Sequence, residues 1–68
     1  MTDTKELEKR IKDSGLKKKY ICEALNLSYQ GFMNKVTNIN FFNTDEVKKL
    51  CKLLNISTKD KERIFFND

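Results

Sequence analysis

Apolar residues recur three or four positions apart in five short runs, and residues that begin or end helices separate these runs. Leu7 and Ile11 share one helical face, for example, and Ser14 with Gly15 then supplies a stop signal. The pattern predicts helices over residues 3–14, 18–25, 28–36, 43–55 and from 57 toward the end of the chain. The chain is therefore expected to fold as an all-α, compact bundle of five short helices.

Several residues mark the ends of these helices. Asp3 with Glu6, and Asn43 with Glu46, have the spacing of a capping box at a helix start. Asn26 follows the second run and tolerates the left-handed backbone conformation, which predicts a sharp turn. Between the third and fourth runs, residues 37–42 are expected to form an extended connection.

With 68 residues, the chain is long enough for one domain, residues 1–68, and one core. No proline interrupts the runs, and 38% of the residues are hydrophobic, which suits a small helical bundle. We expect seven residues on the inward faces to pack in the core, the two cysteines among them in reduced form: Cys22, Phe32, Val36, Phe42, Leu50, Cys51 and Leu54.

The composition argues against several function classes. The chain has no histidine and only two cysteines, so a structural zinc site would need an uncommon ligand set, and the usual general base is missing. No glycine-rich phosphate loop or nucleophile elbow is present. We therefore expect no enzymatic activity, no metal, no cofactor and no small-molecule ligand. No apolar stretch is long enough to cross a bilayer, and we expect a cytoplasmic protein with no membrane partner.

Positive charge is concentrated in one segment. Residues 17–36 hold four lysines against one glutamate, a surplus of three in a chain whose net charge is +4. A local surplus of this kind is typical of a surface that binds a polyanion, although a lysine run is also often only a solvated surface.

The segment from Leu16 to Val36 resembles the helix-turn-helix of the lambda-repressor-like family, also called the XRE or Cro family. The matching positions, in the family's order, are Leu16, Ile21, Cys22, Leu25, Asn26, Leu27 and Ser28, with Phe32 and Val36 as inward residues of the following helix. The resemblance continues through the fourth helix and implies a small Cro-like transcriptional regulator, as encoded by phages, that binds duplex DNA. It departs from the family at Lys17, where a capping threonine or serine is usual, and at Gly31, which weakens a helix interior.

The resemblance implies a set of DNA-contacting residues on the second and third helices and just after them. Those expected to contact bases or phosphates are Lys17, Lys18, Ser28, Tyr29, Gln30, Asn34, Lys35, Asn38 and Asn40. Among these, the amides of Gln30 and Asn34 match the adenine edge in the major groove, and the third helix has no arginine to read guanine. An A·T-rich operator is therefore expected.

A single small domain offers few base contacts, so we expect two copies to bind one operator as a homodimer, with an inverted repeat spaced by about 34 Å. Ile64, Phe65 and Phe66 are consecutive and cannot all face one core, which makes them candidates for the dimer interface. The alternative is a tail that folds back over Leu7 and Ile11, with dimerisation only on DNA.

Two other functions remain open. An antirepressor of the same fold would bind a partner protein through exposed apolar residues such as Met33, Leu53 and the terminal phenylalanines. The chain could also be the DNA-binding domain of a longer repressor, although its length leads us to expect a complete regulator.

Overall fold

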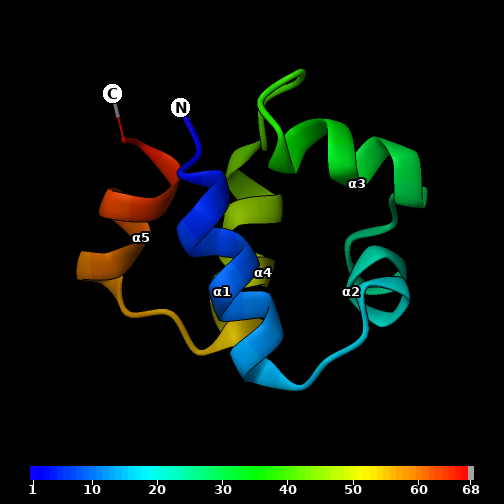
Figure 1. The fold of residues 1–68 in the computed structure, drawn as a ribbon, viewed down its shortest axis with the longest axis horizontal. Coiled ribbons are helices and arrows are strands. Elements are labelled where there is room, and N and C mark those ends of the chain that lie inside the picture. Colours follow the sequence, from blue (N-terminus) through cyan, green and yellow to red (C-terminus); the bar gives the residue numbers. More distant parts are fainter. Residues whose placement is uncertain (68) are drawn as a thin grey trace.

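The structure, a computed structural model, describes residues 1–67. Within these residues it forms helices and no strand (Figure 1). The helices are α1 (Thr4–Ser14), α2 (Lys18–Leu25), α3 (Tyr29–Val36), α4 (Thr44–Leu54) and α5 (Thr58–Phe65). The prediction of an all-α, compact fold with five short helices is confirmed.

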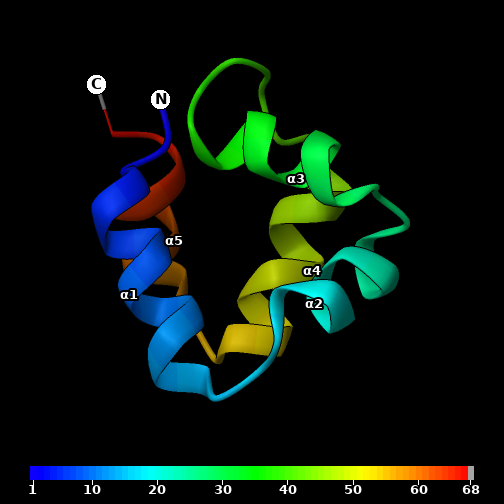
Figure 2. The same cartoon turned by 45° about the vertical axis from the view of Figure 1, so that its right-hand side comes forward.

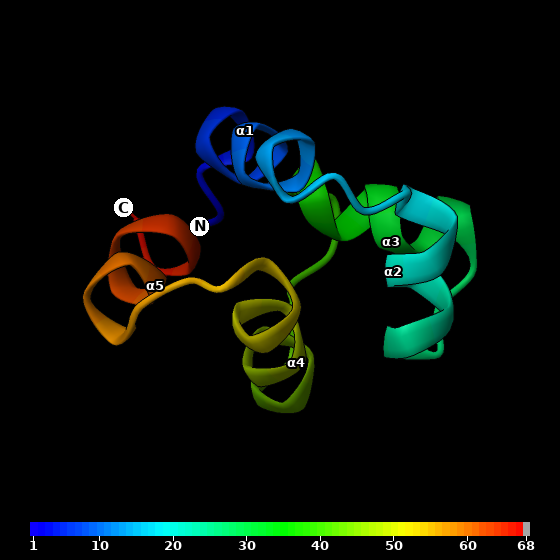
Figure 3. The same ribbon diagram turned by 90° about the horizontal axis from the view of Figure 1, so that it is seen from below.

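Helix α4 lies at the centre of the bundle, where it contacts α1, α2 and α5. Figure 2 shows it between the pair α1 and α5 and the pair α2 and α3. Seen from below, α2 and α3 lie together on one side, and α5 lies on the opposite side (Figure 3). The segment expected to bind nucleic acid, α2 with α3, therefore forms one side of the molecule.

The helices begin at side-chain caps, most of them as the sequence predicts. Asn43 and Glu46 form a complete capping box, in which each side chain bonds the other residue's backbone N–H group. At α1 the box is only half formed. Asp3 accepts a hydrogen bond from the Glu6 N–H group, but the Glu6 carboxylate binds Arg10 at 2.9 Å instead of turning back.

Residues in the left-handed conformation end three of the helices. Gly15, Asn26 and Asn55 have φ angles of 73°, 57° and 56°. Glycine and asparagine adopt this conformation at low cost, so the chain turns sharply after α1, α2 and α4. These turns let short helices fold back onto a single core.

The core collects one face from each helix. Its fully buried side chains are Leu7, Ile21, Phe32, Val36, Leu50 and Ile64, surrounded by Ile11, Cys22, Leu25, Val47, Leu54, Ile56 and Phe65. Phe42 and Cys51 are only partly buried and pack against this cluster. All the residues predicted to face inward do so, with these two at the edge.

The C-terminal residues correct one prediction. Ile64 and Phe65 do not project from the surface as expected for a dimer interface, because both are buried in the core. The Ile64 carbonyl oxygen accepts a hydrogen bond from the Asp3 N–H group at 2.6 Å, and the Phe65 ring meets the Phe42 ring edge-on at a centroid distance of 5.6 Å. Of the three predicted interface residues, only Phe66 is exposed.

The connection between α3 and α4 also differs from the prediction. Its first part is a turn, not an extended segment, because the N–H groups of Ile39 and Asn40 both donate to the carbonyl oxygen of Asn34. Asn38 has a φ angle of 69°, which reverses the chain at the end of α3. Unpaired carbonyl groups at a helix end favour such a turn over an extended chain.

Candidate nucleic-acid interface

A three-residue turn joins α2 to α3. The left-handed Asn26 begins it, and the Leu27 N–H group closes it by donating to the Cys22 carbonyl oxygen at 2.9 Å. Ser28 then starts α3, where its hydroxyl oxygen accepts a hydrogen bond from the Gly31 N–H group at 3.0 Å. The buried side chains of Ile21 and Phe32 hold the two helices to the core.

Gly31 has a local structural role. A Cβ atom at this position would lie 3.0 Å from the Ser28 hydroxyl oxygen, which is tighter than ordinary contacts between these atoms. Glycine therefore leaves room for the hydroxyl group that caps α3. This close approach offsets part of the cost of a glycine inside a short helix.

The outward side of α3 carries polar, uncharged side chains. We call Ser28, Tyr29, Gln30 and Asn34 the reading face; the first three are exposed and Asn34 is half-buried. The Gln30 side-chain N–H group donates to the Asn34 side-chain oxygen at 2.8 Å. Within the part of the chain described, the Gln30 side-chain oxygen and the Asn34 amino group have no hydrogen-bond partner, so the pair keeps one acceptor and one donor unused.

The lysines before and within α2 differ in their surroundings. Lys18 forms an ion pair with Glu8 of α1 at 3.0 Å. Lys17 and Lys19 are exposed, and no carboxylate among residues 1–67 lies within ion-pair distance of either. Lys19 was not among the predicted contacts, although it belongs to the same lysine run. The structure makes it a better candidate for a phosphate contact than Lys18.

The N-terminus of α2 lacks a side-chain cap, whereas each of the other four helices has one. Lys17 holds the cap position in an extended conformation and makes no capping hydrogen bond, as its side chain lacks the hydroxyl group of the usual threonine or serine. The first backbone bond of α2 runs from the Ile21 N–H group to the Lys17 carbonyl oxygen. The three preceding N–H groups have no acceptor among the described residues, and the exposed Lys17 and Lys19 lie in the same turn of the chain.

Two residues predicted to contact DNA have hydrogen-bond partners within the domain. The Lys35 ammonium group donates to both carboxylate oxygens of Glu46, at 2.7 and 2.8 Å, and their side chains are only 18% and 10% exposed. Asn38 exchanges hydrogen bonds with the backbone of Thr2, at 2.8 and 2.9 Å, and so holds the start of the chain against the end of α3. Asn40, the third predicted residue in this region, is exposed.

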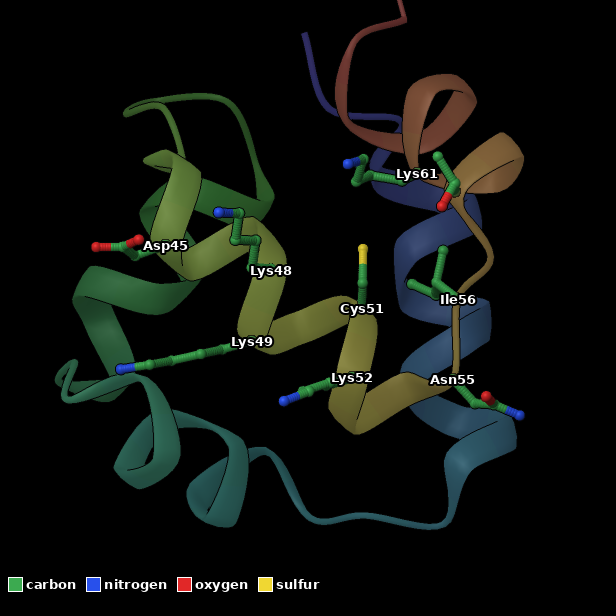
Figure 4. A pocket seen from close by; sticks show the side chains of 9 residues that line it. Asp45, Lys48, Lys49, Cys51, Lys52, Asn55, Ile56 and Lys61 are labelled. Atoms are coloured by element: carbon green, nitrogen blue, oxygen red, sulfur yellow. The ribbon is translucent and has the colours of Figure 1, made fainter.

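A groove of about 670 Å³ lies between α4 and α5 on another side of the bundle. Figure 4 shows Cys51 pointing into it and Lys61 reaching toward α4 from α5. The other lysines that line it, Lys48, Lys49 and Lys52, are exposed, as expected of a solvated surface. Partial burial raises the pKa of the Cys51 thiol, which keeps it protonated and poorly nucleophilic at neutral pH.

The structure adds two observations on the other predicted absences. No cluster of three or more potential metal ligands occurs within residues 1–67. Over the same residues, no helix is long and apolar enough to span a bilayer.

Comparisons with known proteins add no identification. No protein-family model matches the chain, and neither the curated proteins nor the solved structures give a significant match. The functional proposal therefore depends on the residues and geometry of this chain.

Proposed function

We propose that the chain is a sequence-specific regulator of transcription that binds duplex DNA through α2 and α3, used as a lambda-repressor-like helix-turn-helix. The observation that carries this proposal is the reading face of α3. Its side chains are polar, three of the four are exposed, and those of Gln30 and Asn34 hydrogen-bond only to each other among the described residues. The same segment has an uncapped helix end with exposed lysines at the start of α2. A cytoplasmic, Cro-like repressor is the specific role that this arrangement supports best.

In this proposal, α3 enters the major groove with its N-terminal half toward the base edges. Gln30 and Asn34 act as one unit, because their mutual hydrogen bond orients both amides. The Asn34 amino group then donates to adenine N7, and the Gln30 oxygen accepts from the adenine N6 amino group. An adenine in each half-site is the base contact most compatible with this pair.

The N-terminus of α2 binds a backbone phosphate. Its unbonded N–H groups and the positive end of the helix dipole favour an anion at this position. Lys17 and Lys19 add charge next to it, and these contacts fix the position of α3 without reading sequence. Lys18 contributes less in its observed conformation, since it is paired with Glu8.

Lys35 and Asn38 support the interface from behind instead of touching DNA. The ion pair between Lys35 and Glu46 joins α3 to the first turn of α4. Asn38 fixes the end of α3 to the N-terminal segment. Both contacts hold the reading face at one angle to the rest of the domain, which is the requirement for a helix that must fit the groove.

The competing function, an antirepressor that binds a protein partner, has weaker support. Met33 and Leu53, two residues expected to form its apolar surface, are partly buried and pack against the core. Of the terminal phenylalanines, Phe65 is buried, and Phe66 is the one exposed residue among those expected to form this apolar surface.

The salt dependence of binding to a random duplex tests the proposal. Phosphate contacts release counterions, so affinity should fall steeply with salt, and Lys19→Ala should make the logarithmic slope shallower by about one unit. Lys59→Ala, an exposed lysine on α5, is the matched control and should leave the slope unchanged. Binding that is absent, insensitive to salt or equally affected by both variants would contradict the proposal.

A further inference from the structure

The molecule carries an exposed apolar surface at the end where the α3–α4 connection meets the two chain ends. Figures 1 and 2 both show this connection and the termini at the same end of the bundle. The side chains of Met1, Phe41 and Phe66 line one hollow there and are 63%, 81% and 58% exposed. We call these three residues the apolar end.

The exposed area is large for a domain of this size. An aromatic side chain presents roughly 200 Å² when fully exposed, so Phe41 and Phe66 together present roughly 300 Å² of aromatic surface to water. Ile39, two residues before Phe41, is also exposed, at 71%. The largest apolar patch on a typical monomer covers about 300 to 600 Å² and is often an interaction site.

The hollow fits a protein side chain better than a small molecule. Its volume is about 220 Å³, below the usual range of ligand pockets, which begins at about 300 Å³. Beyond Met1, Phe41 and Phe66, it is lined by Thr2, Phe42, Val47 and Phe65. A projecting phenylalanine next to an apolar hollow can bind a surface of the same shape.

We propose that the apolar end is the contact through which a second copy of this chain binds, by a twofold axis that passes close to Phe41 and Phe66. A twofold interface brings a surface against itself, so it must not place like charges opposite each other. No charged side chain is among the described residues that line the hollow, where the terminal ammonium group of Met1 is the charged group, whereas lysines are exposed on much of the remaining surface of a chain with net charge +4. The apolar end is therefore the surface best suited to meet its own copy.

The apolar end lies where a dimer that places α3 in the major groove would need its twofold axis. This part of the inference rests on the proposed function. Two recognition helices in successive major grooves need a twofold axis about 17 Å from the middle of each, half the spacing of about 34 Å. The eight residues of α3 extend about 12 Å, which leaves its C-terminal end about 6 Å from its middle. The connection that carries Phe41 continues from that end, so the base-reading N-terminal halves point away from the axis.

The interface is expected to be weak without DNA. Two copies of the apolar end bury less than the roughly 1,200 Å² of the smallest standard interfaces, which places the free dimer in the class of transient complexes. DNA then brings the two copies together on one operator and adds to their association.

Sedimentation equilibrium of the full chain without DNA, from micromolar to submillimolar concentrations, tests this surface independently of DNA binding. The wild type should show a monomer–dimer equilibrium. Phe41→Ser and Phe66→Ser should each weaken it about 100-fold, because each variant removes two buried aromatic contacts worth about tenfold apiece. Tyr20→Ser, which removes an exposed aromatic side chain from α2, is the control and should dimerise normally.

The outcomes separate this inference from the proposed function. A dimer that Phe41→Ser disrupts supports the surface even if no DNA is bound, and that result would contradict only the regulator proposal. Thermal melting confirms that each variant is folded. A wild type that stays monomeric at all concentrations, or a dimer that neither phenylalanine variant weakens, would overturn the inference.

Discussion

The surface of α2 and α3 and the surface where α1 meets α5 both carry polar side chains, but these side chains differ in their partners. Between α1 and α5, Arg10 binds Glu6 at 2.9 Å and Asp60 at 2.8 Å, and Asp60 also binds Arg63 at 2.9 Å. On the reading face, the amide pair of Gln30 and Asn34 bonds only to itself among the described residues. The first surface stabilises the bundle, and the second presents groups to the outside.

This difference separates polar residues that join two helices from polar residues that are free to bind a ligand. A polar side chain whose partners lie on another helix positions that helix, whereas an exposed group with no such partner is available to a ligand. Lys35 and Lys19 show the contrast between two lysines of the same segment. Lys35 binds Glu46 across two helices, and Lys19 has no carboxylate partner within residues 1–67.

The largest expected effect comes from removing the core contact under the reading face. Phe32→Ala should lower the free energy of unfolding by about 3 to 5 kcal/mol, because the ring is fully buried and leaves a cavity. Tyr29→Ala removes an exposed side chain from the same helix and should change the free energy of unfolding by less than about 0.5 kcal/mol. Chemical denaturation measures both, and similar melting of the two variants would contradict the assigned faces of α3.

The next largest effect tests the contrast between lysines. Lys35→Met keeps the aliphatic stem but leaves the largely buried Glu46 carboxylate without its cation, which should cost about 1 to 3 kcal/mol of stability. Lys18→Met breaks a more exposed pair with Glu8 and should cost less than about 1 kcal/mol. Urea denaturation compares the two.

The same pair of variants should differ in the opposite sense in DNA binding. For folded protein, Lys35→Met should leave the salt slope unchanged, since the ammonium group of this lysine is paired with Glu46. Lys18→Met removes a charge beside the N-terminus of α2 and should make the slope shallower. A shallower slope for Lys35→Met alone would show that Lys35 leaves Glu46 to bind DNA.

A smaller effect is expected at the uncapped end of α2. Lys17→Thr introduces a capping hydroxyl group and should stabilise the free protein by about 0.5 to 1 kcal/mol. The same change should weaken binding to any duplex for two reasons. It removes a positive charge, and the new hydroxyl oxygen would accept a hydrogen bond from a backbone N–H group that is proposed to bind phosphate. Thermal melting and fluorescence anisotropy measure the two effects. A variant with higher Tm and unchanged affinity would argue against a phosphate at this helix end.

The smallest effect concerns the surface between α1 and α5. Hydrogen bonding from Arg10, with further attraction from Arg63, holds the pKa of Asp60 below its ordinary value. The stabilisation of the folded state by ionised Asp60 is therefore complete above about pH 4, the pKa range of an unfolded aspartate. It is lost as the pH falls through the lower pKa of Asp60 in the folded state. Asp60→Asn should make the free energy of unfolding less dependent on pH in this acidic range, as denaturation curves recorded at several pH values would show. Unchanged pH dependence would mean that Asp60 is not tightly paired in solution.

Local patterns were sufficient to predict most of the fold. Helix starts such as Ser28 and Asn43 and helix ends such as Gly15 and Asn26 depend on a few neighbouring residues, so the sequence shows them directly. The inward positions follow from helical spacing, and Phe32 and Val36 are buried as expected.

Much of what the sequence did not show involves contacts between distant segments. The ion pair of Lys35 with Glu46 and the bonds of Asn38 with Thr2 depend on how the helices pack, which no local pattern contains. Ile64 and Phe65 are both buried because the last turn of α5 is enclosed by the N-terminal segment and by Phe42. The exposure of Phe41 could not be predicted either, because this residue lies in a connection, where no helical spacing indicates which side chains face inward.

Selection of bound duplexes from a random library, at a fixed salt concentration, tests the central claim that the reading face of α3 contacts bases. We predict that the wild type enriches an A·T-rich inverted repeat with half-sites about 34 Å apart, and that Gln30→Ala remains folded and loses about 1 to 3 kcal/mol of preference at one position in each half-site. No enriched sequence, or the same sequence enriched with equal strength by Gln30→Ala, would contradict the claim.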